Sequence, residues 1–383
     1  MSVTAAAGFR AAGVTAGLKP SGRPDVAVVV NDGPCCDAAA VFTANRCKAN
    51  PVLWSEQVVK DGSLRAVVLN SGGANCYTGP EGFATTHRTA ERAAELLGIG
   101  AIDVAVCSTG LIGEQLPAEP LLAGVEAAVA ALAPGGGPAL AEAIMTTDSR
   151  PKQAVVSGNG WTVGGAAKGA GMLAPALATM LVVLTTDAVA EPDALERALR
   201  SASAATFDRL DTDGCMSTND TVMLLASGRS GVTPPQADLD AAVEAVCADL
   251  ARQLLADAEG ARHEIRIEVV GAATERDALT AGRAVARSNL FKCAIFGEDP
   301  NWGRVLAAVG TTDAAFDPAE LDVAFNGVTV CRAGGVGEPR DLVDLSGRQV
   351  TVTVDLHAGD ASATIWTCDL THDYVHENSA YST

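Results

Sequence analysis

The sequence predicts an α+β or layered α/β fold, and two observations support that prediction. Short apolar runs of strand length alternate with longer segments whose apolar positions recur at helical spacing. Strands also stand both before and after the blocks of helix, which is the order found in layered folds. The chain has 383 residues, enough for two or more domains, yet no fixed-period repeat and no sustained Pro- or Ser-rich linker divides it.

The N-terminal part is predicted to hold short strands and two helices. The expected strands are apolar runs between Gly and Pro turns, at 25–30, 38–43, 64–70 and, ending in a small polar loop, 101–110. The expected helices cover 83–98, where Gly98 provides a stop, and 119–133. The Gly/Pro run 134–138 that ends the second helix has the composition of a surface loop.

The C-terminal part is predicted to begin with alternating helices and strands and to end in strands. The expected helices are 191–207, the long amphipathic segment 235–260, and 273–290. The expected strands are 221–227, the half-buried alternating run 264–272, and then 321–330, 348–356 and 361–370.

Composition excludes several classes of function. The formal net charge of -19 argues against nucleic acid, whose affinity rests on many Lys and Arg contacts to phosphate, and against an anionic membrane surface. The ten Cys contain no CxxC pair, and the chain begins without a signal peptide's long apolar core, so we expect reduced thiols in a cytoplasm. His372 and His376 are four apart, but a zinc site needs a third protein ligand, so no metal is expected.

The segment 169–186, between Lys168 and Asp187, carries no charge and admits several interpretations. Its eighteen residues only just reach the length of a membrane span, and Pro175 and the missing basic flank argue against one. "GAGMLA" fits the dinucleotide-binding pattern GxGxxA, but Pro175 follows it where a helix would have to begin. A buried strand "TMLVVLTT" entered through a glycine-rich turn is the plain structural interpretation.

A functional interpretation keeps that strand and makes Thr179 reactive. A Thr at the start of a core strand, after a tight turn, can attack the carbonyl before it and cut the bond Ala178–Thr179. The new N-terminal Thr would then hold nucleophile and base in one residue, because its α-amine has a reference pKa of ~7.7–8.0. Such a nucleophile needs no His, and the chain has no evident Ser–His or Cys–His set. The pattern alone leaves both interpretations open.

A family resemblance favours the second interpretation. "KGAGMLAPALATML" matches the core K-G-x-G-M-x-x-P-x-x-A-T-M-L of the ornithine acetyltransferase family, the glutamate N-acetyltransferases of arginine biosynthesis. Further blocks resemble that family in the same order and span nearly the whole chain: "CSTGLIGEQLP", "AIMTTDSRPK", "DGCMSTNDT", "DAEGA", "FGEDPNWGR" and "HENSAYST".

The resemblance implies specific site residues. Thr179 would be the nucleophile and Ala178–Thr179 the cleaved bond, which divides the chain into an alpha chain 1–178 and a beta chain 179–383. Thr109 and Gly110 would form the oxyanion hole, one as a hydroxyl donor and one as a closely approaching N–H. The implied substrate-binding residues are Thr146, Lys168, Thr179, Glu259, Asn378 and Thr383. Asn301, Arg304 and Asp220 are expected to play structural roles behind the site.

The resemblance also implies a fold and a reaction. The fold would be a layered sandwich of helices and strands of the ornithine acetyltransferase and DmpA-like type, similar in layering to N-terminal-nucleophile hydrolases. The reaction would be ping-pong transfer of acetyl from N2-acetyl-L-ornithine to L-glutamate, with no cofactor and with two alpha and two beta chains as a heterotetramer. Whether acetyl-CoA is also a donor stays open. A self-processing amidase or aminopeptidase is the alternative, and a non-cleaving binding protein a third.

Overall fold

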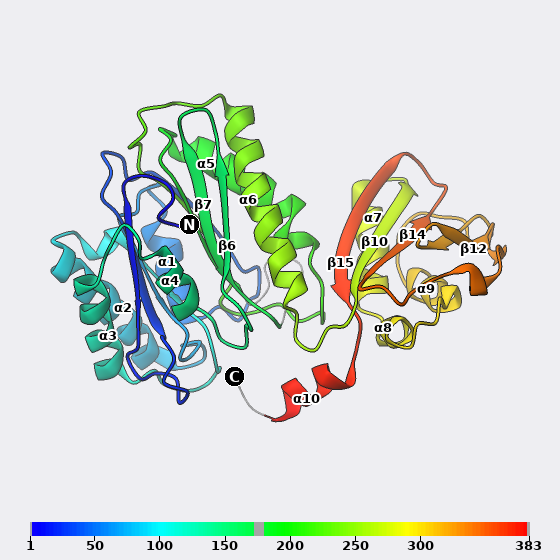
Figure 1. Cartoon of the computed structure of the whole chain (residues 1–383), viewed down its shortest axis with the longest axis horizontal. Coiled ribbons are helices and arrows are strands. Elements are labelled where there is room, and N and C mark those ends of the chain that lie inside the picture. The colour runs from blue at the N-terminus through cyan, green and yellow to red at the C-terminus, as the bar shows by residue number, and fades with distance from the viewer. Residues whose placement is uncertain (1, 172–179, 381–383) are drawn as a thin grey trace.

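The computed structural model of the chain describes residues 2–171 and 180–380 and arranges them in two lobes (Figure 1). The first lobe contains two stacked sheets with their covering helices, and the second contains one sheet covered by helices. The layered α/β fold that the sequence predicts is therefore confirmed.

The first sheet of the first lobe has the strand order β1-β2-β4-β5. Its neighbours are antiparallel except β4 and β5, which are parallel. Three of its strands are buried along their whole length, which explains why they read as unbroken apolar runs. The strands are β1 (Phe9–Val14), β2 (Val26–Asn31), β4 (Ala66–Asn70) and β5 (Val104–Ser108).

The second sheet has the order β3-β9-β8-β7-β6. Its strands are β3 (Ala38–Phe42), β6 (Lys152–Ser157), β7 (Thr162–Lys168), β8 (Leu181–Thr186) and β9 (Thr221–Ala226). β7 and β8 are antiparallel neighbours, with Lys168 opposite Leu181. The last residue of β7 and the first of β8, which flank the stretch 169–180 in sequence, therefore meet at one end of this sheet.

The two sheets stack face to face, and helices cover both outer faces. The inner faces share a core to which each sheet contributes, for example Val29 and Leu69 from the first and Val183 and Leu225 from the second. The first sheet's outer face is covered by α2 (Gly79–Leu97) and α3 (Ala118–Ala130), and the second's by α5 (Pro192–Ala205) and α6 (Gln236–Ala256). α1 (Asn50–Val58) lies against β5, and α4 (Gly137–Ala143) joins the inner core. The first lobe thus has four layers, helix–sheet–sheet–helix.

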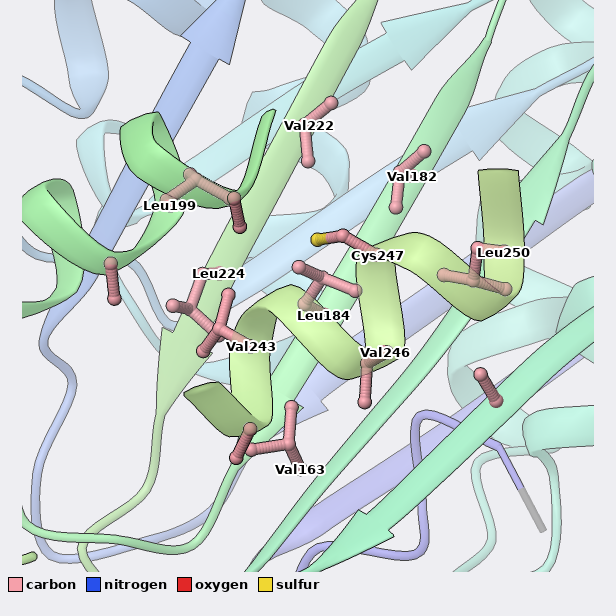
Figure 2. Close-up of a cluster of buried hydrophobic side chains, with 14 of the residues drawn as sticks. Val163, Val182, Leu184, Leu199, Val222, Leu224, Val243, Val246, Cys247 and Leu250 are labelled. Carbon is pink, nitrogen blue, oxygen red and sulfur yellow. The ribbon is translucent and has the colours of Figure 1, made fainter. Parts of the chain in front are cut away.

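Figure 2 shows the hydrophobic cluster between the outer face of the second sheet and α6. Aliphatic side chains of α6 such as Val243 and Leu250 face strand residues such as Leu184 and Leu224. Gly165 of β7 permits this close packing, because a Cβ built there would lie 2.7 Å from Leu184 Cδ2 and 3.1 Å from Leu250 Cδ1. Small residues on the strand therefore bring the helix close to the sheet.

The second lobe is a six-stranded sheet in the order β13-β12-β11-β14-β10-β15. Its strands are β10 (Glu264–Ala272), β11 (Asp322–Phe325), β12 (Val328–Arg332), β13 (Gly335–Val336), β14 (Gln349–Asp355) and β15 (Ala361–Cys368). Its helices are α7 (Glu275–Ala286), α8 (Asn289–Phe296) and α9 (Trp302–Val309), with a 3-10 turn at Arg340–Leu342. In the first lobe, 3-10 turns at Ala101–Asp103 and Phe207–Arg209 precede β5 and follow α5. After β15, α10 (His372–Ala380) runs back towards the first lobe (Figure 1).

Local sequence signals set several helix ends. Pro follows the first residue of α2, and Gly98 closes that helix with a φ of +67°, a left-handed conformation that glycine adopts readily. In the second lobe, side-chain oxygens cap helices: Thr274 accepts from Asp277 N at α7, and Asn301 accepts from Arg304 N at α9. The signals at α2 mark the ends of the helix expected over 83–98, and the helices expected over 191–207 and 235–260 are also observed, as α5 and α6.

Three expectations about elements are corrected. The Gly/Pro run 134–138 is not simply a surface loop, because α4 begins at Gly137, which is buried. The run 321–330 is two strands, divided by the turn Asn326–Gly327, whose residues both have positive φ. The segment 273–290 holds one helix, α7, and the start of another, α8, with Ser288 as its cap.

The described residues contain neither a membrane-spanning helix nor a cluster of metal ligands. None of the helices there combines the length and hydropathy needed to cross a membrane. No group of three or more His, Cys, Asp and Glu in the same part of the chain could hold a metal ion. His372 and His376 share α10, as their spacing suggested.

Candidate active site

A cavity of about 260 Å³ lies where the end of β5, the end of β7 and the loops after α4 and α6 come together. Six of the residues singled out in the sequence line it: Thr109, Gly110, Thr146, Lys168, Glu259 and Asn378. Leu111, Ile112, Thr147, Gly171, Ser217, Thr218 and Asn219 complete the lining. These residues are far apart in the chain, so the fold brings together what the sequence motifs mark separately.

Gly110 has a backbone that only glycine fits well. Its φ is +129°, and a Cβ built there would lie 2.8 Å from Gly73 N and 2.9 Å from Gly73 Cα. Within the described part of the chain its N–H donates no backbone hydrogen bond. An N–H held at a cavity wall without an acceptor can serve an oxygen that carries developing negative charge.

Thr109, the residue before Gly110, carries the hydroxyl expected to be the second donor at this turn. Its backbone is fixed on both sides, because its N–H donates to Asn70 O at 3.0 Å and its carbonyl accepts from Gly73 N at 3.0 Å. Its hydroxyl oxygen lies 3.4 Å from Lys168 Nζ. Because an ammonium only donates, the Thr109 hydroxyl accepts from it and keeps its own hydrogen for another acceptor.

A buried amide network holds this turn in place. Asn219 Nδ2 donates to Ser108 O at 2.8 Å and to Ala74 O at 2.6 Å. Ser108 Oγ donates to Asn70 Oδ1 at 2.5 Å, and Asn70 Nδ2 donates to Gly73 O at 3.2 Å. The loop before β9 is therefore tied to the ends of β4 and β5, which fixes the expected oxyanion hole from behind.

Lys168 is the fixed cation of the site. It is only 1% exposed, at the last position of β7. Burial lowers the pKa of its ammonium, and the negative charge of Asp148 is the largest effect that opposes this shift.

Asp148 is buried behind the cavity and accepts three hydrogen bonds. Its Oδ1 accepts from Lys152 Nζ at 2.5 Å and from Gly169 N at 2.6 Å, and its Oδ2 accepts from Thr146 N at 3.0 Å. Burial alone would raise the pKa of Asp148, but the charges of Lys168 and Lys152 outweigh it and hold that pKa low. Lys152 Nζ also contacts Asp257 Oδ2 at 2.6 Å.

Glu259 and Asn378 of the C-terminal helix form another part of the cavity wall. Asn378 Nδ2 donates to Glu259 Oε2 at 2.9 Å and to Tyr374 O at 3.0 Å. Glu259 N donates to Ala170 O at 3.0 Å, and a Cβ on Gly171 would lie 2.6 Å from Glu259 Oε2. The tail is therefore docked at the cavity through Asn378, as the sequence-based assignment of that residue requires.

Ala178, Thr179 and Thr383 lie outside the described residues, so the expectations about them are not tested by the geometry. Met180, the residue after Thr179 in sequence, donates its N–H to Asp220 Oδ1 at 3.0 Å and accepts from Thr221 N at 3.2 Å. Burial raises the pKa of Asp220 well above its ordinary value, against the opposing effects of the Met180 N–H, Ser217 and Lys168.

Sequence reasoning missed part of the site. Asp148 and Lys152 stand inside the block "AIMTTDSRPK", but single charges in a motif do not reveal that they are buried together. Of the three residues expected behind the site, Asp220 bonds Met180, whereas Asn301 and Arg304 belong to α9 in the second lobe. Asn301 caps that helix, and neither Asn301 nor Arg304 is among the described residues that line the cavity.

The fold and the cavity define a four-layer α/β protein with a pair of donors, a buried cation and a carboxylate facing one small site. The sequence model of the ArgJ family matches residues 10–383. The arginine biosynthesis bifunctional protein ArgJ of Streptomyces coelicolor is 66% identical over 382 residues, which cover 100% of both chains. The chain therefore belongs to the ArgJ family.

The chain is also similar to solved structures. An ornithine acetyltransferase from Mycobacterium tuberculosis, in complex with ornithine, is 57% identical with a TM-score of 0.45, and the match covers 47% of this chain and 96% of that one. The arginine biosynthesis bifunctional protein ArgJ of Bacillus halodurans is 34% identical with a TM-score of 0.49, covering 51% of this chain and 97% of that one.

Proposed function

We propose that this protein is a self-cleaving N-acetyltransferase that moves acetyl from N2-acetyl-L-ornithine to L-glutamate in arginine biosynthesis. The observation that carries the proposal is the cavity itself, which gathers Thr109 and Gly110 with a buried cation and a carboxylate. Membership of the ArgJ family and the name of the Streptomyces coelicolor relative support the same pathway.

In the first half-reaction Thr179 is the nucleophile. Its Oγ adds to the acetyl carbonyl carbon while its hydroxyl proton passes to its own α-amine, which cleavage after Ala178 sets free. The carbonyl oxygen becomes an oxyanion and accepts hydrogen bonds from Gly110 N–H and the Thr109 hydroxyl. The C–N bond then breaks, the departing ornithine nitrogen takes the proton from the ammonium, and acetyl remains as an ester on Thr179.

In the second half-reaction the amine of glutamate attacks the ester. The new C–N bond forms, the C–Oγ bond breaks, and the proton lost by the amine returns through the Thr179 α-amine to Oγ. The mechanism is ping-pong, because ornithine leaves before glutamate reacts, and the ester must be protected from water while it waits. None of these steps calls for a cofactor.

The charges of the cavity fit the donor in one orientation. In acetylornithine the α-carboxylate is attached to the same carbon as the acetylated nitrogen, whereas the side-chain ammonium is at the far end. Lys168 lies beside Thr109, so we assign the α-carboxylate to Lys168, and we assign the ammonium to Glu259, the carboxylate among the described lining residues. Thr146 and Asn378 also line the cavity, and we assign both to substrate binding. Thr383 is assigned to substrate binding from the family pattern.

A hydrolase is the rival function, with water in place of glutamate. Purified protein is incubated with acetylornithine, with and without glutamate, and acetylglutamate and free acetate are both measured. We expect acetylglutamate to form at the rate at which ornithine is released, with little acetate. Release of acetate at the same rate in the presence of glutamate would replace the transferase by an amidase. Acetyl-CoA as donor in a parallel assay tests whether the protein also accepts a second acetyl donor.

Two features of the cellular form belong to the same proposal. The ten cysteines are all free, which suits a reducing compartment such as the cytoplasm. We assign the active form as two alpha chains, 1–178, with two beta chains, 179–383.

A further inference from the structure

Asp148 lies at a junction between separate parts of the proposed site. It is only 2% exposed, and its two oxygens accept from the backbone N–H groups of Thr146 and Gly169. Thr146 belongs to the loop after α4, and Gly169 follows Lys168 at the end of β7. One side chain therefore fixes the distance between two segments that both line the cavity.

The negative charge of Asp148 is balanced by a buried lysine, Lys152. Lys152 is fully buried and contacts Asp148 and Asp257, so it neutralises part of the negative charge behind the cavity. Asp257 in turn accepts from Ser149 N at 3.0 Å and is not among the described residues that line the cavity. A buried group with this many partners is expensive to maintain for stability alone, since apolar residues could fill the same space.

We propose that Asp148 is a positioning residue of the active site, which sets the Thr146 and Gly169 backbone and keeps the Lys168 ammonium placed beside the Thr109 hydroxyl. This inference rests on the proposed function, because it assigns the anion-binding end of that same cavity. It distinguishes Asp148 from Asp257, which shares the Lys152 partner but not the contacts to the site.

The charged groups that act on Lys168 come from several elements. Asp148, Asp220 and Glu259 raise its pKa, while Lys152 opposes them. Lys19, between β1 and β2, also interacts with Lys168, and burial lowers the pKa of Lys19 to about 8. Loss of the Asp148 charge lowers the pKa of Lys168, so its ammonium loses the proton at lower pH and the alkaline limb of kcat/KM moves to lower pH.

The test compares Asp148→Asn with Asp257→Asn, its matched control. Both remove one carboxylate from Lys152, so both are expected to lower Tm. Only Asp148→Asn is expected to raise the KM for acetylornithine, by about 10- to 100-fold, the range seen when groups that orient ligands from behind are removed. The alkaline limb of the kcat/KM profile of Asp148→Asn should also move to lower pH. The same shift is expected in a Lys19→Gln background, in which Lys19 no longer titrates. An equal rise in KM for Asp257→Asn would overturn the proposal.

The triple variant Asp148→Asn, Lys152→Met and Asp257→Asn separates positioning from charge burial. With all three charges gone, neither the Lys152 ammonium nor the Asp257 carboxylate is left without a partner, so Tm is expected to recover relative to Asp148→Asn. KM is expected to stay high, because Lys168 still lacks its counter-charge. Recovery of both Tm and KM would mean that Asp148 only balances Lys152, and would overturn the proposal.

A binding measurement keeps this inference separate from the proposed function. Ornithine is titrated calorimetrically into each variant, which requires no turnover. Ornithine binding that is weakened in Asp148→Asn but not in Asp257→Asn supports the positioning role. Failure of the wild-type protein to form acetylglutamate would count against the transferase proposal only and would leave this binding result valid. Unchanged ornithine binding in Asp148→Asn would overturn the positioning role while leaving the transferase proposal intact.

Discussion

Lys168 shows at the scale of one residue how burial and function are balanced in this protein. A lysine with 1% exposure loses the hydration that favours its charged form. Asp148, Asp220 and Glu259 oppose this loss from three different segments, Asp148 most strongly, but burial still lowers the pKa of Lys168. Because Lys168 Nζ lies 3.4 Å from the Thr109 hydroxyl oxygen, the charges around Lys168 act next to the expected oxyanion donor.

The first prediction concerns that hydroxyl. Thr109→Val keeps the shape of the side chain but removes the donor, so kcat for acetyl transfer should fall by about 100- to 1000-fold, as when a single oxyanion-hole donor is lost elsewhere. Thr109→Ser retains the hydroxyl and is the control. Kinetics of both variants, together with Tm, check the assignment: if Thr109→Val keeps kcat within about twofold of the wild type, Thr109 is not a donor.

Six of the residues that line the cavity could be predicted from the sequence, whereas the residues that support them could not. Thr109, Gly110, Thr146, Lys168, Glu259 and Asn378 stand in recognisable blocks, and the fold places all six around one cavity. The supporting groups could not be found this way. Asp148 and Asp257 are 109 positions apart and are brought together by Lys152, a contact that has no local signal in sequence.

At the scale of elements, α10 connects the second lobe to the site. Thr371 Oγ1 donates to Gly260 O at 2.7 Å and accepts from Tyr374 N at 3.0 Å, which anchors the start of the helix on the loop that carries Glu259. The buried pair His263 and Asp369, with Nδ1 and Oδ2 2.7 Å apart, fastens the strand after that loop to the segment before the helix. Asn378 reaches Glu259 because both chain segments are fixed in this way.

The second prediction is that displacing α10 weakens substrate binding. A Cβ on Gly260 would lie 2.2 Å from Tyr374 N, so Gly260→Ala must shift the start of the helix. The KM for acetylornithine should rise more than kcat falls, because a binding group moves while the nucleophile does not.

Gly231→Ala is the matched control for that experiment. Gly231 has a similar positive φ, +69° against +61°, but nothing lies within 4 Å of its Cβ position. It carries the same backbone strain without a displaced neighbour. Equal KM values for the two variants would show that α10 has no part in binding.

At the scale of the whole molecule, the loop before β9 is held between the lobes. Asp211 contacts Arg287 of the second lobe, with Oδ2 and Nε 2.8 Å apart, and the loop then runs on to Ser217 and Asn219 at the cavity. Burial raises the pKa of Asp211 to about 6. The second lobe therefore supports the site indirectly, through α10 and through this loop.

Elements with strong periodicity were predictable, and the arrangement of the layers was not. The strand over 64–70 and the helix over 235–260 follow from apolar pattern and length alone. β7, with "VGGAA" at its centre, has no strand signal, because its glycines are dictated by α6 packed above it and by Ser2 beside it. Contacts from distant segments determine such an element, so its own residues cannot reveal it.

The last prediction is that self-cleavage leaves the two chains in one folded unit. Cleavage between Ala178 and Thr179 would assign β3, β6 and β7 to the alpha chain and β8 and β9 to the beta chain, yet all five form one sheet. β7 and β8 pair from Val163 opposite Thr186 to Lys168 opposite Leu181, and the cores on both faces of the sheet draw on both chains. Separation would therefore cost the folding free energy of the lobe, so the chains should elute together in native buffer and separate only in denaturant.

Denaturing electrophoresis, N-terminal sequencing and size exclusion on the same preparation decide the matter. Wild-type protein should give two bands, with the second beginning "TMLVVLTT", and a single native peak whose mass by light scattering reports whether two alpha and two beta chains assemble. Thr179→Ala lacks the hydroxyl and should remain one chain with the same elution volume, because the sheet does not depend on the cut. A wild-type chain that stays intact and fully active would remove Thr179 as the nucleophile. Two chains that elute apart would instead show that the shared sheet does not survive cleavage.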